Sequence, residues 1–130
     1  MTAGLARGQG QSLPSRLFSG FAVLTLVGVA GQFLLAGLSI FGAADAWGVH
    51  GLSGGLIALP VLGMLGLAFA TPTLHRFRRD AGVLTGVYLV QVTLAGVGSE
   101  VPLVGALHPL NALIMGDVAM GIAKARFARV

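Results

Sequence analysis

The chain has 130 residues, of which 55% are hydrophobic and only 9% are charged. A soluble globular domain carries about 25% charged residues, so this composition excludes an ordinary water-exposed surface and indicates an integral membrane protein in contact with the lipid bilayer. The net charge of +4 does not indicate nucleic-acid binding, because the eight Lys and Arg residues stand near the chain ends and in one short internal segment. Without cysteine, the sequence excludes disulfides, thiolate chemistry and cysteine-ligated metal centres.

Four apolar segments follow one another along the chain. We expect transmembrane helices at about residues 17–41, 47–70, 81–98 and 104–123. At about 1.5 Å per residue, each reaches or nearly reaches the roughly 30 Å thickness of a hydrocarbon layer. The first segment is longer than the roughly 7–15 apolar residues of a cleavable signal peptide, so we expect it to be retained. The sequence predicts an all-α membrane protein, with a flexible cytoplasmic tail over residues 1–16 and a single four-helix domain over residues 17–130.

The connections between these segments differ in charge. The stretches GAADAWG and GSEVPLVG contain Asp45 and Glu100 but no Lys or Arg, whereas TPTLHRFRRD contains three arginines. The other basic residues lie near the two chain ends, so a four-helix threading places every Lys and Arg on one side of the membrane. By the positive-inside rule, we expect both termini and the middle connection in the cytoplasm and the two acidic connections outside.

The two halves of the chain contain an internal repeat. Gln32 and Gln91 each open a Gln-x-x-Leu-Ala-Gly stretch, and His50 and His108 each follow one of the acidic connections. Because both copies begin on the same side of the membrane, we expect two helical hairpins of parallel topology, related by a pseudo-two-fold axis along the membrane normal. This symmetry places the two histidines at one depth near the outer ends of the second and fourth helices, facing each other across the bundle.

Two facing histidines suit a cofactor that is itself symmetric. A haem iron takes an imidazole on each axial face, and four-helix bundles hold such groups between facing helices. We therefore expect His50 and His108 to be the ligands of one haem b. Gly37 and Gly96 would lie close to the histidine level, where bare backbone leaves room for a flat tetrapyrrole. The alternative is that the histidines are interfacial polar residues copied by duplication.

Four further polar residues follow the same repeat. Gln32 lies about 13 Å from the outer end of the first helix, and Gln91 lies nearer the end of the third. Both glutamines are either cofactor contacts or hydrogen-bond links between helices. Ser53 and Asn111 come three residues after the two histidines. Their side chains, or a loop carbonyl, are the candidate acceptors for the second ring nitrogen of each histidine.

Through His50 in WGVHGLSGG, His108 in ALHPLNALI and the preceding LAGLS, the chain resembles one four-helix half of haem A synthase and the small four-helix b-type membrane cytochromes. It also resembles uncharacterised four-span bacterial membrane families. The resemblance implies one haem near the outer face of the bacterial cytoplasmic (inner) membrane. No acidic residue stands beside either histidine to serve the synthase's oxygenase chemistry, and one module holds one site, so the resemblance does not extend to the synthase reaction.

Asp117 lies in the fourth helix, about 13 Å below the histidine level. A carboxylate at the centre of a membrane helix costs about 3 kcal/mol, so we expect it to be paired or functional. Its partner would be Lys124 or an arginine of the 76–79 cluster; otherwise it is a proton-carrying site or a contact with a partner subunit. We expect a kink at Pro60 and assign no ligand role to His75, which lies on the other side of the membrane from the histidine pair.

These residues predict a small membrane cytochrome or haem-binding subunit that transfers electrons and is not a stand-alone catalyst. The alternative is a cofactor-free accessory subunit, whose glycine-containing helix faces pack against other membrane subunits or against a second copy. A midplane transporter is less compatible with the sequence, because the repeat is parallel and its helices lack the interruptions typical of such sites.

Overall fold

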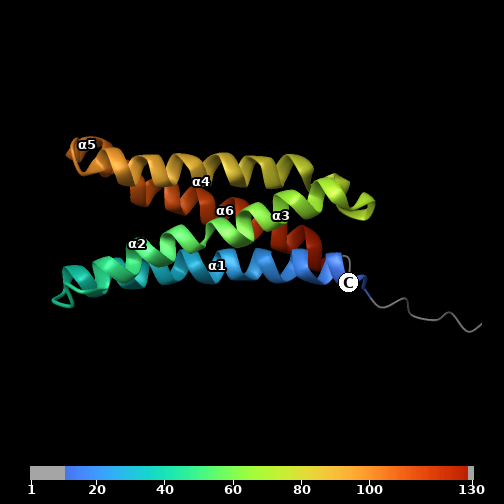
Figure 1. The fold of residues 1–130 in the computed structure, drawn as a ribbon, viewed down its shortest axis with the longest axis horizontal. Helices are drawn as coiled ribbons and strands as arrows, with labels where there is room; N and C mark the ends of the chain where they lie inside the picture. Colours follow the sequence, from blue (N-terminus) through green and yellow to red (C-terminus); the bar gives the residue numbers. More distant parts are fainter. Residues whose placement is uncertain (1–10, 129–130) are drawn as a thin grey trace, which may run out of the picture.

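The computed structural model describes residues 11–128, and Figure 1 shows them as long helices packed side by side in one bundle. Four helical spans are long and apolar enough to cross a membrane. They cover Leu13–Ile40, Ala46–Ala70, Pro72–Gly98 and Pro102–Phe127. No strand occurs within residues 11–128. The predicted all-α, four-helix membrane bundle is confirmed.

Three of the four spans consist of more than one helical element. The first is the single helix α1 (Leu13–Ile40). The others are, in order, α2 (Ala46–Leu56) with α3 (Ala58–Ala70), η1 (Pro72–Phe77) with α4 (Arg78–Gly98), and α5 (Pro102–Gly105) with α6 (Leu107–Phe127).

Two boundaries differ from the sequence prediction at the same end of the bundle. Of the predicted tail 1–16, residues 1–10 lie outside the described residues, and α1 already begins at Leu13. The arginine-containing segment predicted as a loop is also helical, because η1 starts at Pro72 and continues directly into α4. In both places a proline stands within the first two helical positions, where its fixed φ favours the helix and its missing N–H costs no hydrogen bond.

The second span is interrupted at Ile57, three residues before Pro60. Pro60 has no N–H to donate to the carbonyl four residues earlier, so the helical hydrogen-bond ladder cannot run through this point. Beside this interruption, the hydroxyl of Tyr88 of α4 donates to the carbonyls of Gly54 (3.2 Å) and Gly55 (3.1 Å) and so ties the end of α2 to α4. The kink predicted from Pro60 takes this form. A matching interruption at Ala106 precedes Pro109 by the same interval and was not predicted.

The spans form a ring in which each packs against its two neighbours: α1 against α2 and α3, α3 against α4, α4 against α6, and α6 against α1. The two hairpins obey the predicted repeat in their packing. When Gln32 is aligned with Gln91 and His50 with His108, buried residues of one hairpin fall on buried residues of the other. Such pairs include Phe18 and Phe77, Ala22 and Ala81, Val29 and Tyr88, Ile57 and Met115, Val61 and Ala119, and Met64 and Ile122.

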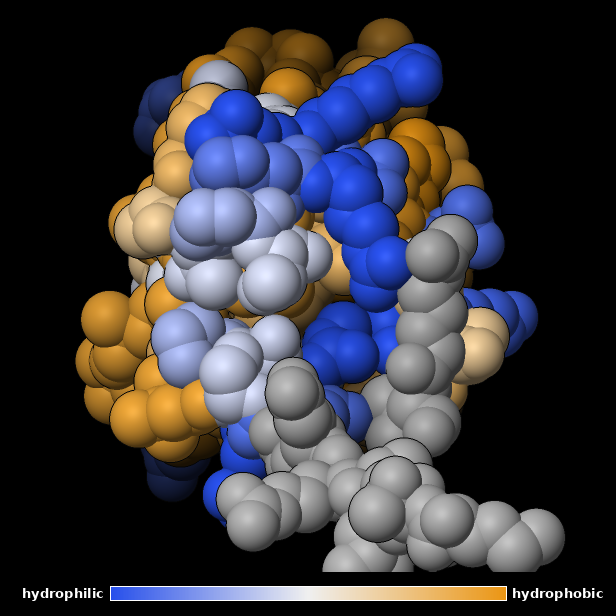
Figure 2. All heavy atoms as spheres, turned by 90° about the vertical axis from the view of Figure 1, so that its right-hand side faces the viewer, coloured by the Kyte–Doolittle hydropathy of each residue, from blue (hydrophilic) through white to orange (hydrophobic). Residues whose placement is uncertain are grey.

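Basic side chains gather at one end of the bundle, which we call the basic end. It is formed by the start of α1, the start of α4 with η1, and the end of α6, and Figure 2 shows its hydrophilic residues side by side. Arg126 is buried there and donates to the Gln11 side chain and to the Ser15 carbonyl. Asp45 and Glu100 lie in the connections at the opposite end, which we call the histidine end. The segregation of charge expected from the sequence is therefore present in the fold.

Candidate functional site

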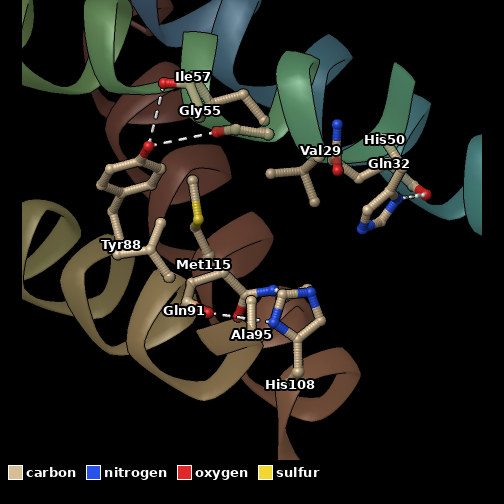
Figure 3. A pocket seen from close by; sticks show the side chains of 14 residues that line it. Val29, Gln32, His50, Gly55, Ile57, Tyr88, Gln91, Ala95, His108 and Met115 are labelled. Carbon is tan, nitrogen blue, oxygen red and sulfur yellow. Dashed lines mark hydrogen bonds between the residues drawn. The ribbon is translucent and has the colours of Figure 1, made fainter. Parts of the chain in front are cut away.

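His50 and His108 meet at the histidine end of the bundle. His50 lies in α2 and His108 is the second residue of α6, two spans that are diagonal to each other in the ring. The ring centroids are 6.2 Å apart and the ring planes are inclined by 54°, and Figure 3 shows the two side chains directed toward one another. Trp47 meets the His50 ring edge-on at 5.5 Å. The structure thus brings together the two histidines that the repeat singled out.

Each histidine is held by the backbone of the preceding span. Nδ1 of His50 lies 3.1 Å from the carbonyl oxygen of Gln32, and Nδ1 of His108 lies 3.1 Å from that of Gln91. A carbonyl oxygen only accepts, so in both rings Nδ1 carries the proton and donates it. The opposite nitrogen, Nε2, then retains its lone pair. Both imidazoles are therefore fixed in the tautomer that a metal-binding histidine uses.

Of the acceptors expected from the sequence, a backbone carbonyl is the kind observed, but both carbonyls belong to helices, α1 and α4, and not to a loop. Ser53 and Asn111 were candidates, but neither side chain takes the Nδ1 proton. Asn111 instead donates to the Gln91 side-chain oxygen (2.7 Å) and to the Val87 carbonyl (3.0 Å). The Ser53 hydroxyl lies 2.8 Å from the Gln32 side chain. Both side chains therefore contact a glutamine side chain, and that glutamine in turn contacts the histidine.

The two glutamine side chains occupy equivalent places beside the rings. Nε2 of Gln91 lies 3.1 Å from Nε2 of His108, so this amide donates to the lone pair of the ring. The Gln32 amide pairs donors with acceptors when its oxygen faces the Ser53 hydroxyl and the Gly54 N–H, and its nitrogen faces the His50 carbonyl at 3.0 Å. In that orientation its nitrogen is also 3.3 Å from Nε2 of His50. It is equally close to Nδ1 of His50, at 3.2 Å, so both amides lie against their histidine rings, but only the Gln91 amide binds Nε2 alone.

A cavity of about 270 Å³ extends from the histidine pair toward the middle of the bundle. Its walls include both histidines, both glutamines, Tyr88 and Met115, and Figure 3 shows these side chains around the open space. Most of the remaining lining is apolar. Such an apolar hollow with a few convergent polar groups is typical of ligand-binding sites in helical bundles.

The glycines in the cavity wall are not the two that the sequence indicated. Gly37 and Gly96 do not line the cavity, and a Cβ at either would meet no atom of the described chain within 4 Å. The histidines are level with Gln32 and Gln91, because α1 and α4 continue past them toward the histidine end. Gly37 and Gly96 therefore lie beyond the level of the histidines, and their contact with a cofactor stays a prediction.

Glycines of α2 form part of the cavity wall instead: Gly51, Gly54 and Gly55. A Cβ on Gly54 would lie only 3.1 Å from the Gln32 amide atom that faces the His50 carbonyl, so a larger residue here would push the amide away from the backbone of α2. The GLSGG run that follows His50 was the available signal. Tyr88 was also missed, although it is the only tyrosine in the chain and stands within an apolar segment, where a hydroxyl needs a partner.

Asp117 and His75 lie away from this site. Asp117 is exposed on the outside of the bundle, and it forms no hydrogen bond or ion pair with any residue in the range 11–128. The expected pairing with Lys124 or with an arginine of the 76–79 cluster is thus not found within that range. His75 belongs to η1 at the basic end, as expected. The described residues contain no group of three or more His, Asp or Glu side chains that could hold a metal ion.

Comparison with known proteins adds one relationship. No curated protein and no solved structure matches the chain. A family described as a family of unknown function (DUF6220) matches residues 32–98, a stretch that begins at Gln32 and ends with α4. It includes His50, Tyr88 and Gln91 and stops before His108. Because this match covers just over half of the 130 residues, the chain belongs to the DUF6220 family.

Proposed function

We propose that the chain is a small membrane b-type cytochrome, with one haem b held between His50 and His108. The observation that supports this proposal most strongly is the pair of facing imidazoles whose Nδ1 protons are both bound by backbone carbonyls. This arrangement leaves Nε2 of each ring as the ligand atom and fixes the direction of its lone pair.

The separation of the rings fits two ligands on one metal. A metal–imidazole bond is about 2 Å long and a ring nitrogen lies about 1 Å from its ring centre, so two imidazoles on opposite sides of one metal have centroids about 6 Å apart. The centroids of His50 and His108 are 6.2 Å apart. The observed separation therefore matches the one that a metal held by both imidazoles would require.

The protein contributes orientation and an apolar surrounding. The carbonyls of Gln32 and Gln91 fix the orientation of both rings, and a hydrogen bond to Nδ1 makes Nε2 a stronger ligand. The Gln91 amide must turn away from Nε2 of His108 before that atom can bind a metal. The cavity is at the small end of ligand pockets, which measure about 300–1,000 Å³, so the helices must also separate at the histidine end to admit a whole tetrapyrrole.

When bound, such a haem supplies one-electron oxidation and reduction. Because His50 and His108 would both hold the haem iron, the proposed activity is electron transfer and not chemistry on a substrate bound at the metal. By the positive-inside rule the basic end faces the cytoplasm and the histidine end lies near the outer surface, in a bacterial cytoplasmic membrane. Electrons would then enter or leave close to the outer face.

An absorption spectrum of the full-length chain, purified in detergent after expression with added haem precursor, tests this proposal. We expect a Soret band that shifts on dithionite reduction, sharp α and β bands, and about one haem per chain. His50→Ala and His108→Ala should each remove these features while the protein still inserts into the membrane. His75→Ala, at the basic end, is the matched control and should leave the spectrum unchanged. A colourless wild-type protein from haem-replete cells would contradict the proposal.

One observation favours the alternative of a cofactor-free accessory subunit. His108 already has both ring nitrogens hydrogen-bonded, by the Gln91 carbonyl and by the Gln91 amide that Asn111 holds in place. A polar network satisfied in this way can serve to lock helices together. In that case His108→Ala lowers the thermal stability of a protein that carries no haem, whereas the cytochrome proposal requires a spectral change.

A further inference from the structure

A groove of about 490 Å³ runs along the outside of the bundle between α1 and α6. Its walls are apolar except for one carboxylate, and they include Ala30, Phe33, Leu113, Gly116, Asp117 and Met120. The small residues Ala30 and Gly116 lie on opposite walls, one on each helix. In membranes, helices associate through such small-residue surfaces, because lipid gives no hydrophobic drive toward protein contact.

Asp117 is the feature of this groove that lipid alone does not explain. It is the eleventh of the 21 residues of α6, so it lies at the middle of the helix, and its side chain is exposed. No residue in the range 11–128 forms a hydrogen bond or ion pair with it. Ionisable side chains within membrane spans almost always face the protein interior or pair with another group. An exposed, unpaired carboxylate at this depth therefore indicates a partner that covers the groove.

The pseudo-symmetry of the bundle shows that the carboxylate is specific to this face. When His50 is aligned with His108, Asp117 falls on Leu59 of α3. Leu59 is 68% exposed on the corresponding outer face of the other hairpin. The first hairpin thus presents an ordinary lipid-compatible surface where the second presents a charge. Only the face between α1 and α6 carries the feature that needs a partner.

A second copy of this chain does not supply that partner. The sequence contains no Lys or Arg between residues 17 and 75 or between residues 80 and 123, so another copy offers no cation at the depth of Asp117. Two copies facing each other through this groove in the same orientation would also bring their Asp117 side chains together, with like charges in a medium of low dielectric constant. Acyl chains cannot neutralise the carboxylate either. The complementary group must come from a different protein.

From these observations we infer that the groove between α1 and α6 docks a transmembrane helix of another protein, which places a Lys or Arg side chain against Asp117. Ala30 and Gly116 allow the close approach of that helix, and the ion pair removes the cost of an isolated charge in the membrane. This inference is independent of the proposed haem site, because the groove lies on the outer surface and none of the histidine or glutamine side chains lines it.

A membrane two-hybrid selection in bacteria, with the full-length chain as bait, tests the inference. The prey is a library of single-span helices of Leu and Ala in which the eight central positions are randomised, so that depth and face are not fixed in advance. Against the wild-type chain, we expect helices with a central Lys or Arg to be enriched about tenfold over helices without one. Against Asp117→Leu, this enrichment should disappear.

Two further baits make the outcome specific. Asp117→Lys should reverse the preference toward helices with a central Asp or Glu. The double variant Asp117→Leu with Leu59→Asp moves the carboxylate to the equivalent position of the first hairpin, away from Ala30 and Gly116, and should not restore the enrichment. The inference is overturned if recovered helices show no basic preference, or if the same helices are recovered with Asp117→Leu. It is also overturned if the full-length chain, paired with itself as bait and prey in a separate assay, associates in a manner that depends on Asp117.

Discussion

The rings of Phe18 and Phe77 contact each other across the bundle axis, with centroids 5.0 Å apart and planes inclined by 34°. The two residues are equivalent in the internal repeat and come from α1 and η1. His50 and His108 form the corresponding pair at the other end of the bundle. The pseudo-two-fold axis is thus marked at both ends by a contact between equivalent rings, one apolar at the basic end and one polar at the histidine end.

The aromatic pair predicts a measurable coupling. Both rings are buried, so Phe18→Ala or Phe77→Ala should each lower the free energy of unfolding by roughly 3 kcal/mol through the cavity left behind. Because the rings contact each other, the double variant should lose about 0.5–1.5 kcal/mol less than the two single losses together. Unfolding of the protein in mixed detergent micelles gives these values. Leu24→Ala, at a position 57% exposed, is the control and should change stability by less than about 0.5 kcal/mol. Strict additivity would show that the two rings do not stabilise each other.

The helix interruption at Ile57 predicts a role for a single hydroxyl. Tyr88→Phe removes the donor that satisfies the Gly54 and Gly55 carbonyls but keeps the buried ring. We expect the free energy of unfolding to fall by about 1 kcal/mol, and amide hydrogen exchange near residues 54–58 to become faster. Thr93→Val is the matched control, since the Thr93 hydroxyl donates to the carbonyl of Leu89 within its own helix. Equal effects of the two substitutions would contradict a special role for Tyr88.

The geometry around His108 separates the backbone of Gln91 from its side chain. Gln91→Ala removes the amide that donates to Nε2 but leaves the carbonyl that binds Nδ1. If the cytochrome proposal is correct, this variant keeps its haem spectrum, and its haem-free form unfolds at a lower temperature than the haem-free wild type. Asn111→Ala should act in the same direction, because it releases the Gln91 side chain. Loss of haem absorbance in Gln91→Ala would show that the amide is needed for binding.

Two neighbouring glycines of α4 should respond in opposite ways to alanine. A Cβ on Gly98 would lie 2.5 Å from the Cα of Gly105, where the end of α4 meets α5, so Gly98→Ala should destabilise the bundle by about 1–3 kcal/mol. Gly96→Ala meets no described atom within 4 Å and gains helix propensity, so it should be neutral or stabilise by up to about 1 kcal/mol. Thermal unfolding in detergent compares the two. A destabilising Gly96→Ala would mean that something covers this exposed position in the membrane.

The four spans, their order and the meeting of the histidines could be predicted from the sequence because they depend on hydrophobic length and on a repeat. Each helix buries the face that packs against its neighbours. The repeat then gives each position of one hairpin an equivalent position in the other. The residues that hold His50 and His108 could not be predicted in this way. Their acceptors are backbone carbonyls of Gln32 and Gln91, and every residue has a carbonyl, so the sequence carries no signal for that choice.

The depth of Gly37 and Gly96 could not be predicted for a different reason. The number of residues to the helix end does not give the depth of Gly37 and Gly96 relative to the histidines, because α1 and α4 extend beyond the histidine level. The depth of a residue relative to the opposite helix depends on how antiparallel spans slide past each other, and that shift is set by side-chain packing across the whole bundle. Asp117 shows a third limit. Its depth could be estimated from the sequence, but its direction could not, because α6 carries apolar residues on all sides.

The buried Arg126 has a consequence for chain connectivity. By holding the end of α6 against Ser15, it makes the first and last spans neighbours at the basic end, where α3 and η1 are joined covalently. The contact between α1 and α6 thus resembles the junction between α3 and η1, so the chain ends could stand at either of these two places. A circular permutant that starts at Pro72 and ends at Thr71, with the original ends joined by a flexible linker, should form the same bundle. The order in which the two hairpins follow each other along the chain therefore does not determine the bundle that they form.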